Sequence, residues 1–147
     1  MKELVTVSKE ECDITLHPDT NQGEINYQLG VLSAYLNETT LRYEKHAQAY
    51  SKAEAKFQSD KLYLDGMEQI FIAEYEHETG KRLSVDAMKC KAKAAHQDEF
   101  LALVKSQETR DVLKIAVSTL ERLIKATEVK ISVRQSKSER ICRVYIF

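Results

Sequence analysis

The chain has 147 residues, about the length of a single domain. It contains 43% hydrophobic and 31% charged residues, with only four Gly and one Pro. So few turn-forming residues argue against a β-sandwich or barrel, and the abundance of Ala, Glu, Lys and Leu favours long helices. No apolar run approaches the roughly 18–20 residues that cross a bilayer, and the first residues lack the apolar centre of a signal peptide. We therefore expect one mainly α-helical domain over 1–147, without membrane contact.

The charges are unevenly distributed although the net charge is only −1. Residues 1–78 hold seven Lys or Arg against fifteen Asp or Glu, a net charge of −8. Residues 79–147 hold fifteen against eight, a net charge of +7. Two interpretations remain open: the basic half binds an anionic partner, or the two halves pack together and complement each other.

The N-terminal segment, residues 1–20, differs from the rest of the chain. It carries two short runs that favour strands, Leu4–Val7 and Ile14–Leu16, followed by the breaker Pro18. This segment could provide the N-terminal half of a small β element.

A helical pattern extends over residues 24–78. From Ile25 to Phe71, positions at alternating steps of four and three are apolar or aromatic in eleven of fourteen cases. Because strands alternate every two residues, this period predicts a coiled-coil seam on one long helix. Thr39, His46 and Asp60 are the polar exceptions. The residues expected to form the packing or oligomer seam are Leu29, Leu32, Leu36, Tyr43, Tyr50, Phe57, Leu64 and Phe71.

The predicted helix ends near Gly80, where a glycine can adopt the left-handed conformation that closes a helix. Ser84 is a suitable N-cap for a second helix, residues 84–137, of nearly equal length. Its apolar phase slips around residues 106–110, which indicates either a stutter or a break. A turn this short demands antiparallel neighbours, so we expect a long helical hairpin.

A two-helix hairpin exposes apolar surface on its outer sides, and oligomerisation would cover it. The tail, residues 140–147, is β-branched and aromatic. It could pair with the N-terminal segment in a small sheet, or it could extend a partner's sheet.

We expect no enzyme, no metal site and no cofactor. No arrangement of nucleophile and base stands out, no phosphate-binding P-loop is present, and the four histidines do not pair at helical spacing. Cys12, Cys90 and Cys142 are too few and too widely spaced for a disulfide framework or a zinc site. Reduced thiols predict a cytoplasmic location, which is the host cytoplasm if the chain is phage-encoded.

Two basic zones predict nucleic-acid contacts, because clustered Lys and Arg bind phosphate backbones through counterion release. The first zone follows the predicted turn and the second lies near the C-terminus. The residues expected to bind nucleic acid are Lys81, Arg82, Lys89, Lys91 and Lys93 in the first zone, and Arg134, Lys137, Arg140 and Arg143 in the second.

The turn and the helices beside it resemble phage recombination-mediator proteins of the UvsY type over about residues 25–136. The matching features are a Tyr- and Ala-rich helix from Tyr43 to Glu76, the turn Thr79–Ala87, the Lys-bearing stretch Met88–Lys93 and the basic end Leu120–Arg134. This resemblance implies a homo-oligomer that binds single-stranded DNA and loads a RecA-like recombinase onto DNA covered by a single-strand-binding protein. It also implies that the protein works without an active site.

A second interpretation is a protein-interaction module. A phage-encoded inhibitor of a host defence complex, or a coiled-coil adaptor, could use the acidic first half to occupy a partner's nucleic-acid groove.

Overall fold

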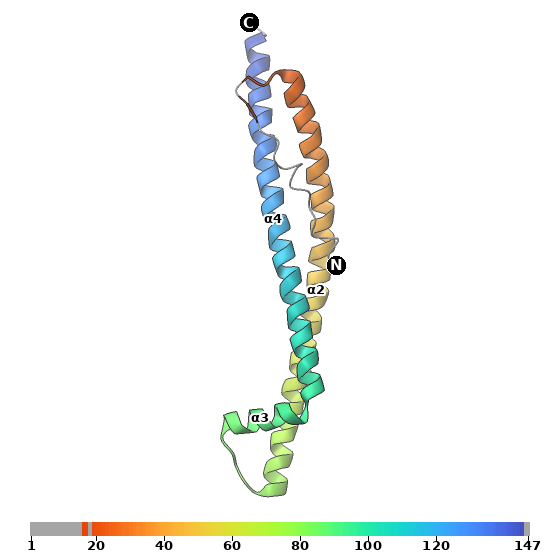
Figure 1. The fold of residues 1–147 in the computed structure, drawn as a ribbon, viewed down its shortest axis with the longest axis vertical. Helices are drawn as coiled ribbons and strands as arrows, with labels where there is room; N and C mark the ends of the chain where they lie inside the picture. The colour runs from red at the N-terminus through yellow and green to blue at the C-terminus, as the bar shows by residue number, and fades with distance from the viewer. Residues whose placement is uncertain (1–15, 18, 146–147) are drawn as a thin grey trace. The chain divides into compact units, whose positions relative to one another are not determined.

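A computed structural model describes residues 16, 17 and 19–145 of the chain. These residues contain three helices and no strand: α2 (Gln22–Thr79), α3 (Val85–Ala95) and α4 (Gln97–Tyr145) (Figure 1). The chain divides into two units. Unit 1 combines Met1–Ala47 with Ile115–Phe147, and unit 2 is Gln48–Lys114. In each unit a part of α2 packs against a part of α4, which confirms the predicted mainly α-helical fold and helical hairpin.

Local side-chain chemistry defines the ends of the helices. The Asn21 side chain accepts a hydrogen bond from the Glu24 backbone N–H at 2.8 Å, so α2 begins two residues before its predicted start. Gly80 has a φ of 64° and follows the last residue of α2. Ser84 caps α3, since its Oγ accepts from the Ala87 N–H at 3.3 Å. The predicted end at Gly80 and the predicted cap at Ser84 are both confirmed.

Unit 1 is held together by a seam with a seven-residue period. On α2 the buried positions include Ile25, Leu32, Thr39 and His46, each seven residues after the last. On α4 the residues Leu120, Thr127 and Arg134 are buried at the same interval. This period keeps one face of each helix turned toward its neighbour.

Polar bonds in the seam of unit 1 show that the helices are antiparallel. Near the start of α2, the Gln22 side chain donates to Ser138 Oγ at 2.6 Å. Farther along α2, Tyr43 donates its hydroxyl proton to Glu121 at 3.2 Å, and this bond to a carboxylate raises the pKa of Tyr43. The partner on α4 moves toward lower numbers as α2 proceeds, as an antiparallel pair requires.

A charged group occupies one layer of this seam. Arg134 is only 3% exposed, and its Nε donates to Gln28 Oε1 at 2.8 Å. Gln28 in turn donates to Glu24 at 3.2 Å, so the amide links the guanidinium to a carboxylate. Burial lowers the pKa of Arg134. The bonded chain of three side chains stabilises a charge that burial alone would disfavour.

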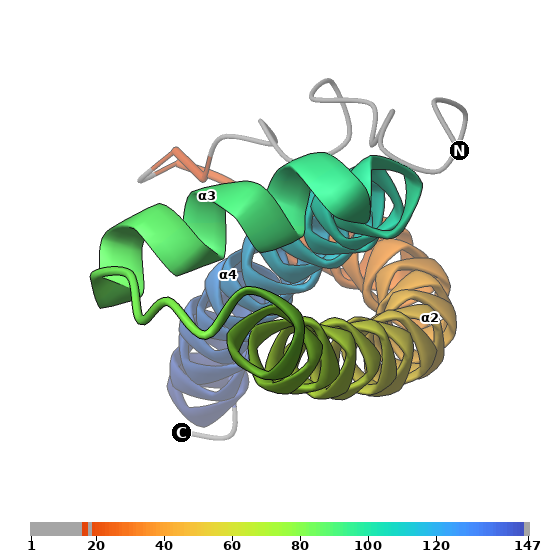
Figure 2. The same ribbon diagram turned by 90° about the horizontal axis from the view of Figure 1, so that it is seen from below.

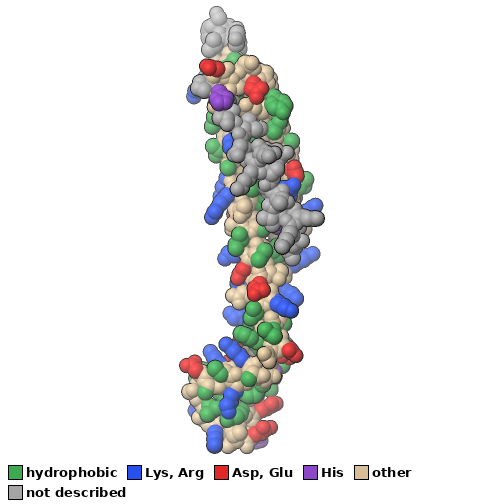
Figure 3. Space-filling view, viewed as in Figure 1, with side chains coloured by type: hydrophobic (Ala, Val, Ile, Leu, Met, Phe, Trp, Pro, Cys, Tyr) green, Lys and Arg blue, Asp and Glu red, His purple; other side chains and the backbone are tan. Residues whose placement is uncertain are grey.

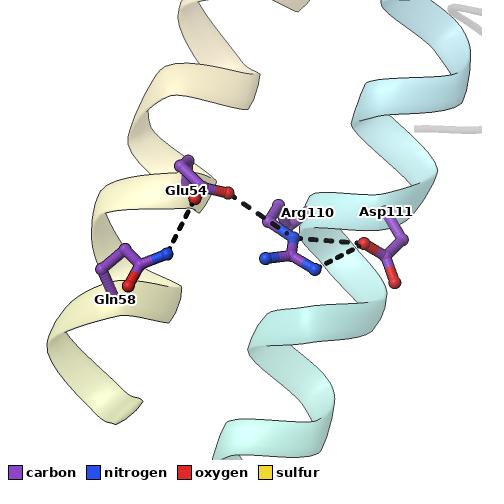
Figure 4. Close-up of polar contacts among 4 residues, drawn as sticks. All are labelled: Glu54, Gln58, Arg110 and Asp111. Carbon is purple, nitrogen blue, oxygen red and sulfur yellow. Dashed lines mark hydrogen bonds and ion pairs between the residues drawn. The ribbon is translucent and has the colours of Figure 1, made fainter. Parts of the chain in front are cut away.

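Unit 2 also has a partly polar seam (Figure 4). The Arg110 guanidinium lies 4.0 Å from the centroid of the buried Phe57 ring. It also reaches Glu54 on α2 at 3.5 Å and Asp111 on its own helix at 3.0 Å. One turn away, the buried Ser106 donates to Asp60. Cation–π and charge-assisted contacts therefore replace apolar packing in this part of the hairpin.

The predicted seam residues of α2 all lie in protected positions. Leu32 and Phe57 are buried, and none of the others is exposed. The partly buried ones are Leu29, Leu36, Tyr43, Tyr50, Leu64 and Phe71.

The second helix differs from the prediction in the place of its break. The helix is interrupted at His96, between α3 and α4, and it is continuous through residues 106–110. The backbone bonds from His96 N–H to Ala92 and from Phe100 N–H to His96, both 3.0 Å, keep the interruption to one residue. The apparent phase slip arose because Ser106 and Arg110 are polar residues at true seam positions.

The predicted tail strand is corrected for the part that the structure describes. Residues 140–145 are helical and form the last part of α4, which ends at Tyr145, so they do not form a strand. The strands predicted before residue 16 lie outside the described residues.

The buried arginine layer generates a stability prediction. Replacing Gln28 by Leu removes the acceptor at Arg134 Nε and should lower the free energy of unfolding by about 1–3 kcal/mol. The double variant Gln28→Leu/Arg134→Met should lose less unfolding free energy than the single variants Gln28→Leu and Arg134→Met lose together. The difference should be about 0.5–3 kcal/mol, because the double variant leaves no buried charge without its partner. Urea unfolding followed by circular dichroism at one fixed protein concentration measures both.

Arg140→Met is the matched control, because Arg140 is an exposed arginine on the same helix. It should change the unfolding free energy by no more than about 0.5 kcal/mol. Additive effects of the two seam substitutions would contradict the prediction.

Candidate nucleic-acid interface

The linker after α2 and the short helix α3 carry the first predicted basic zone. Met88 and Ala92, four residues apart, are buried and fix the inner face of α3. Lys89, Lys91 and Lys93 are therefore exposed. Lys81 and Arg82 in the preceding linker are exposed as well. All five residues of the first zone are thus exposed, and a single acidic residue, Asp86, lies among them in the sequence.

Within unit 2, α3 runs across the direction of α2 (Figures 1 and 2). Figure 3 shows Lys and Arg side chains over α3 on the face in view, with acidic side chains toward the margin. With Met88 and Ala92 buried, Lys89 and Lys93 lie on one flank of α3 and Lys91 lies on the other, beside Tyr75 of α2.

Aromatic rings lie directly beside two of these lysines. Lys91 Nζ donates to the Tyr75 hydroxyl at 3.1 Å and lies 4.7 Å from the centre of that ring. Lys93 Nζ lies 5.0 Å from the ring centre of Phe100. Phe71 continues the cluster, 6.3 Å from Tyr75 and 6.2 Å edge-on from His96. Basic groups alternating with partly accessible rings are the usual surface for single-stranded nucleic acid.

The sequence alone did not assign these aromatic residues to the site. The sequence pattern assigned Phe71 to the seam, and neither predicted basic zone included an aromatic residue. The spacing of Phe71 and Tyr75, four residues apart on the last turns before a basic linker, is the signal that could have identified them.

The hydrogen bond from Lys91 also changes the acidity of Tyr75. That bond, together with the positive charges of Lys91 and Lys81, lowers the pKa of Tyr75, and burial opposes the shift only in part.

Acidic residues of α2 lie close to the basic segment. Arg82 Nε is 3.9 Å from Glu76, although the Arg82 side chain remains 90% exposed. Across residues 71–100 there are five basic and six acidic side chains, a net charge of −1. The basic side chains of this range all lie on the linker and α3, whereas the end of α2 and the start of α4 are acidic.

The second basic zone is not a single surface. Arg134 is buried in the seam and bonded to Gln28, so its assignment to nucleic-acid binding is corrected to a packing role. Lys137 is partly buried and donates to the backbone oxygen of His17 at 2.7 Å. Arg140 is exposed, and the side chain of Arg143 lies outside the described residues.

Lys137 and Arg140 line a groove of about 980 Å³ in unit 1. The lining of this groove also includes three apolar residues, Leu16, Val133 and Ile141. The groove therefore combines two basic and three apolar side chains with five uncharged polar ones, which are Thr20, Asn21, Gln22, Ser132 and Ser136, and none of the described lining residues is aromatic.

Other reactive chemistry is sparse in the described part of the chain. Cys90 is an exposed free thiol between two lysines. Over residues 16, 17 and 19–145 no group of three or more His, Cys, Asp or Glu side chains is placed to hold a metal ion. No helix in this range is both long enough and apolar enough to cross a bilayer.

Comparison of the chain with protein-family models, with curated proteins and with solved structures finds no match.

The contact between Lys91 and Tyr75 gives a direct test of the local potential. Lys91→Met removes the donor and one positive charge, so the pKa of Tyr75 should rise toward that of free tyrosine. Alkaline titration of tyrosinate absorbance, with the Tyr75→Phe curve subtracted, isolates this one group among the seven tyrosines.

Lys93→Met is the matched control, since it removes an equal charge two residues away without touching the Tyr75 hydroxyl. It should leave the pKa of Tyr75 nearly unchanged. An equal rise in both variants would show that the hydrogen bond is not the main cause.

Proposed function

We propose that this chain is a non-enzymatic, single-stranded-DNA-binding protein that acts as a recombination mediator. The observation that supports the proposal is the juxtaposition of exposed lysines on α3 with the rings of Tyr75 and Phe100. Phosphates would bind the ammonium groups by counterion release, and bases would stack on the accessible ring faces.

The site suits single strands better than a duplex. Stacking on Tyr75 or Phe100 needs unpaired bases, because a duplex buries the base faces within its own stack. The side chains of the cluster offer charge and aromatic surface, which every nucleotide can use, so binding without sequence preference is expected. This behaviour is what a protein that loads other proteins onto DNA requires.

The resemblance to UvsY-type mediators extends the proposal to partners. A RecA-like recombinase would be loaded, and a single-strand-binding protein would be displaced. A mediator holds and exchanges binding partners without bond chemistry, so the proposal needs no catalytic group, metal or cofactor.

The salt dependence of DNA binding tests the proposal. With a fluorescent oligothymidylate, the logarithm of the affinity should fall linearly with the logarithm of salt concentration, with a slope of about −0.7 per neutralised phosphate. The variant Lys89→Ala/Lys91→Ala/Lys93→Ala should weaken binding at low salt and reduce the magnitude of the slope by about 2. Fluorescence anisotropy measures both quantities.

Lys52→Ala/Lys56→Ala/Lys61→Ala is the matched control. It removes three exposed lysines from the same unit and changes the net charge equally. Its slope should remain that of the unchanged protein. An equal loss of affinity in both variants would show that binding depends only on the net charge of the protein. Absence of salt-sensitive binding by the unchanged protein would refute the proposal.

The protein-interaction module is the second candidate, and the acidic last turns of α2 favour it. Glu74, Glu76 and Glu78 lie beside the basic segment and present a negative surface of their own. Such a surface could occupy the nucleic-acid groove of a host defence complex.

The variant Glu74→Gln/Glu76→Gln/Glu78→Gln separates the two functions. If the chain binds DNA, removing three negative charges near α3 should raise its affinity for the oligonucleotide, because repulsion falls. If the acidic surface is the functional one, DNA affinity stays negligible and a stoichiometric protein complex is lost. Anisotropy and size-exclusion chromatography report the two results.

A further inference from the structure

The groove of unit 1 is partly formed by the loop that leads into α2. Leu16, the first described residue, belongs to its lining, and so does Thr20. Lys137 of α4 donates to the backbone oxygen of His17 at 2.7 Å. Thr20 Oγ1 accepts from the His17 N–H at 3.1 Å and donates to the same oxygen at 2.7 Å. These bonds hold the loop against α4, so the chain that precedes Leu16 is attached at the groove itself.

The lining of this groove is positively charged. Lys137 and Arg140 contribute two positive charges, and no acidic residue is among the described lining residues. Acidic residues do occur nearby in the sequence, at Asp19, Glu24 and Glu139, but none of them lines the groove. A ligand with negative charge is therefore favoured here.

The lining also contains a hydrogen-bond acceptor that lacks a donor. Gln22 donates its side-chain N–H groups to Asn26 at 2.9 Å and to Ser138 at 2.6 Å. Its Oε1 atom is buried and has no hydrogen-bond partner among the described residues. A buried carbonyl oxygen without a donor costs free energy, so a ligand that brings an N–H or O–H group would be stabilised. Such a ligand also needs an apolar group to cover Val133 and Ile141.

The sequence directly before Leu16 has these three properties. We call residues 10–15 the acidic segment. It has no basic residue and three acidic ones, which are Glu10, Glu11 and Asp13. Ile14 supplies an apolar side chain, and every backbone N–H of the segment is a donor. The acidic segment lies outside the described residues, and its composition matches the groove in charge, apolar surface and hydrogen bonding.

We propose that the acidic segment binds the groove of its own unit. Its carboxylates lie at Lys137 and Arg140, and its apolar side chain covers Val133 and Ile141. Because the segment is attached at Leu16, its effective concentration at the groove is of the order of millimolar, which favours it over a free peptide. Bound in this way, it keeps phosphates from two residues of the second basic zone. The inference is independent of the proposed function, since it involves neither α3 nor DNA for its test.

Disulfide trapping through Cys12 tests the proposal in the full-length chain. Cys90→Ser and Cys142→Ser leave Cys12 as the only thiol, and Ser136→Cys adds one in the lining of the groove. A disulfide requires Cα atoms within about 7 Å of each other. In a glutathione redox buffer, the fraction oxidised at equilibrium gives the effective concentration of the two thiols. We expect a disulfide within one chain, identified by non-reducing electrophoresis and peptide mass spectrometry.

Gln135→Cys is the matched control, because Gln135 is exposed on α4 beside Ser136 and does not line the groove. Its effective concentration with Cys12 should be about tenfold lower, since successive residues of a helix point about 100° apart. Ser132→Cys, one turn away in the same lining, is a second trapping position if the first variant is less helical by circular dichroism.

The charges of the acidic segment are tested in the same background. Glu10→Gln/Glu11→Gln/Asp13→Asn should lower the effective concentration at Ser136→Cys by about 3–10-fold, as lost exposed charge pairs predict. Salt at about 1 M, where the Debye length is about 3 Å, should have a similar effect. Glu74→Gln/Glu76→Gln/Glu78→Gln changes the net charge equally in unit 2 and should have no effect.

Three results would overturn the proposal. The first is an equal effective concentration for Gln135→Cys and the two groove positions, which would show that the segment does not select the groove. The second is a disulfide that joins two chains, which would make the occupant a second copy. The third is trapping that neither the neutral variant nor salt reduces, which would remove charge as the basis of binding.

Discussion

The seven-residue burial period is the constraint on which this structure depends. On α4 the residues Ser106, Leu113, Leu120, Thr127 and Arg134 follow one another at this interval, and every one is buried. A two-helix pair can bury only one such face of each helix, and the seam uses part of that face for polar groups. Less apolar area is then available to hold the pair together, and the bonds of Arg134 and Ser106 must compensate for desolvation. These polar layers also fix the register, because a shift of one heptad would separate Arg134 from Gln28 and Ser106 from Asp60.

Much of this fold follows from the sequence because it depends on local pattern. The period from Ile25 to Phe71 predicted α2, and the conformational freedom of Gly80 predicted its end. The interruption at His96 was missed because no glycine or proline marks it. The acidic pair Asp98 and Glu99, in the first turn of α4, is the only local signal of a new helix start.

Two other errors in the second helix share one cause, the assumption that seam positions are apolar. Ser106 and Arg110 looked like a break for that reason, and Arg134 looked like a ligand for DNA. Arg134 lies seven residues after Thr127, which lies seven after Leu120, so the sequence spacing alone places Arg134 in the seam. The prediction of a DNA-binding role relied on its positive charge and not on its position. The aromatic cluster near α3 depends instead on contacts between residues of different helices, such as Phe71 with His96, and periodicity along one helix cannot reveal those.

The same rule of position separates the basic residues by role. An arginine at a seam position, such as Arg134 or Arg110, is held by amide, carboxylate or aromatic neighbours and serves packing. The lysines on α3 are exposed, and Lys91 and Lys93 meet the rings of Tyr75 and Phe100 at the surface. These exposed groups can release counterions on meeting a phosphate, whereas the seam arginines are largely withdrawn from water. The electrostatic contribution to any nucleic-acid binding by this chain must therefore come from exposed residues outside the seven-residue period, and on α3 two of these, Lys91 and Lys93, lie beside aromatic rings.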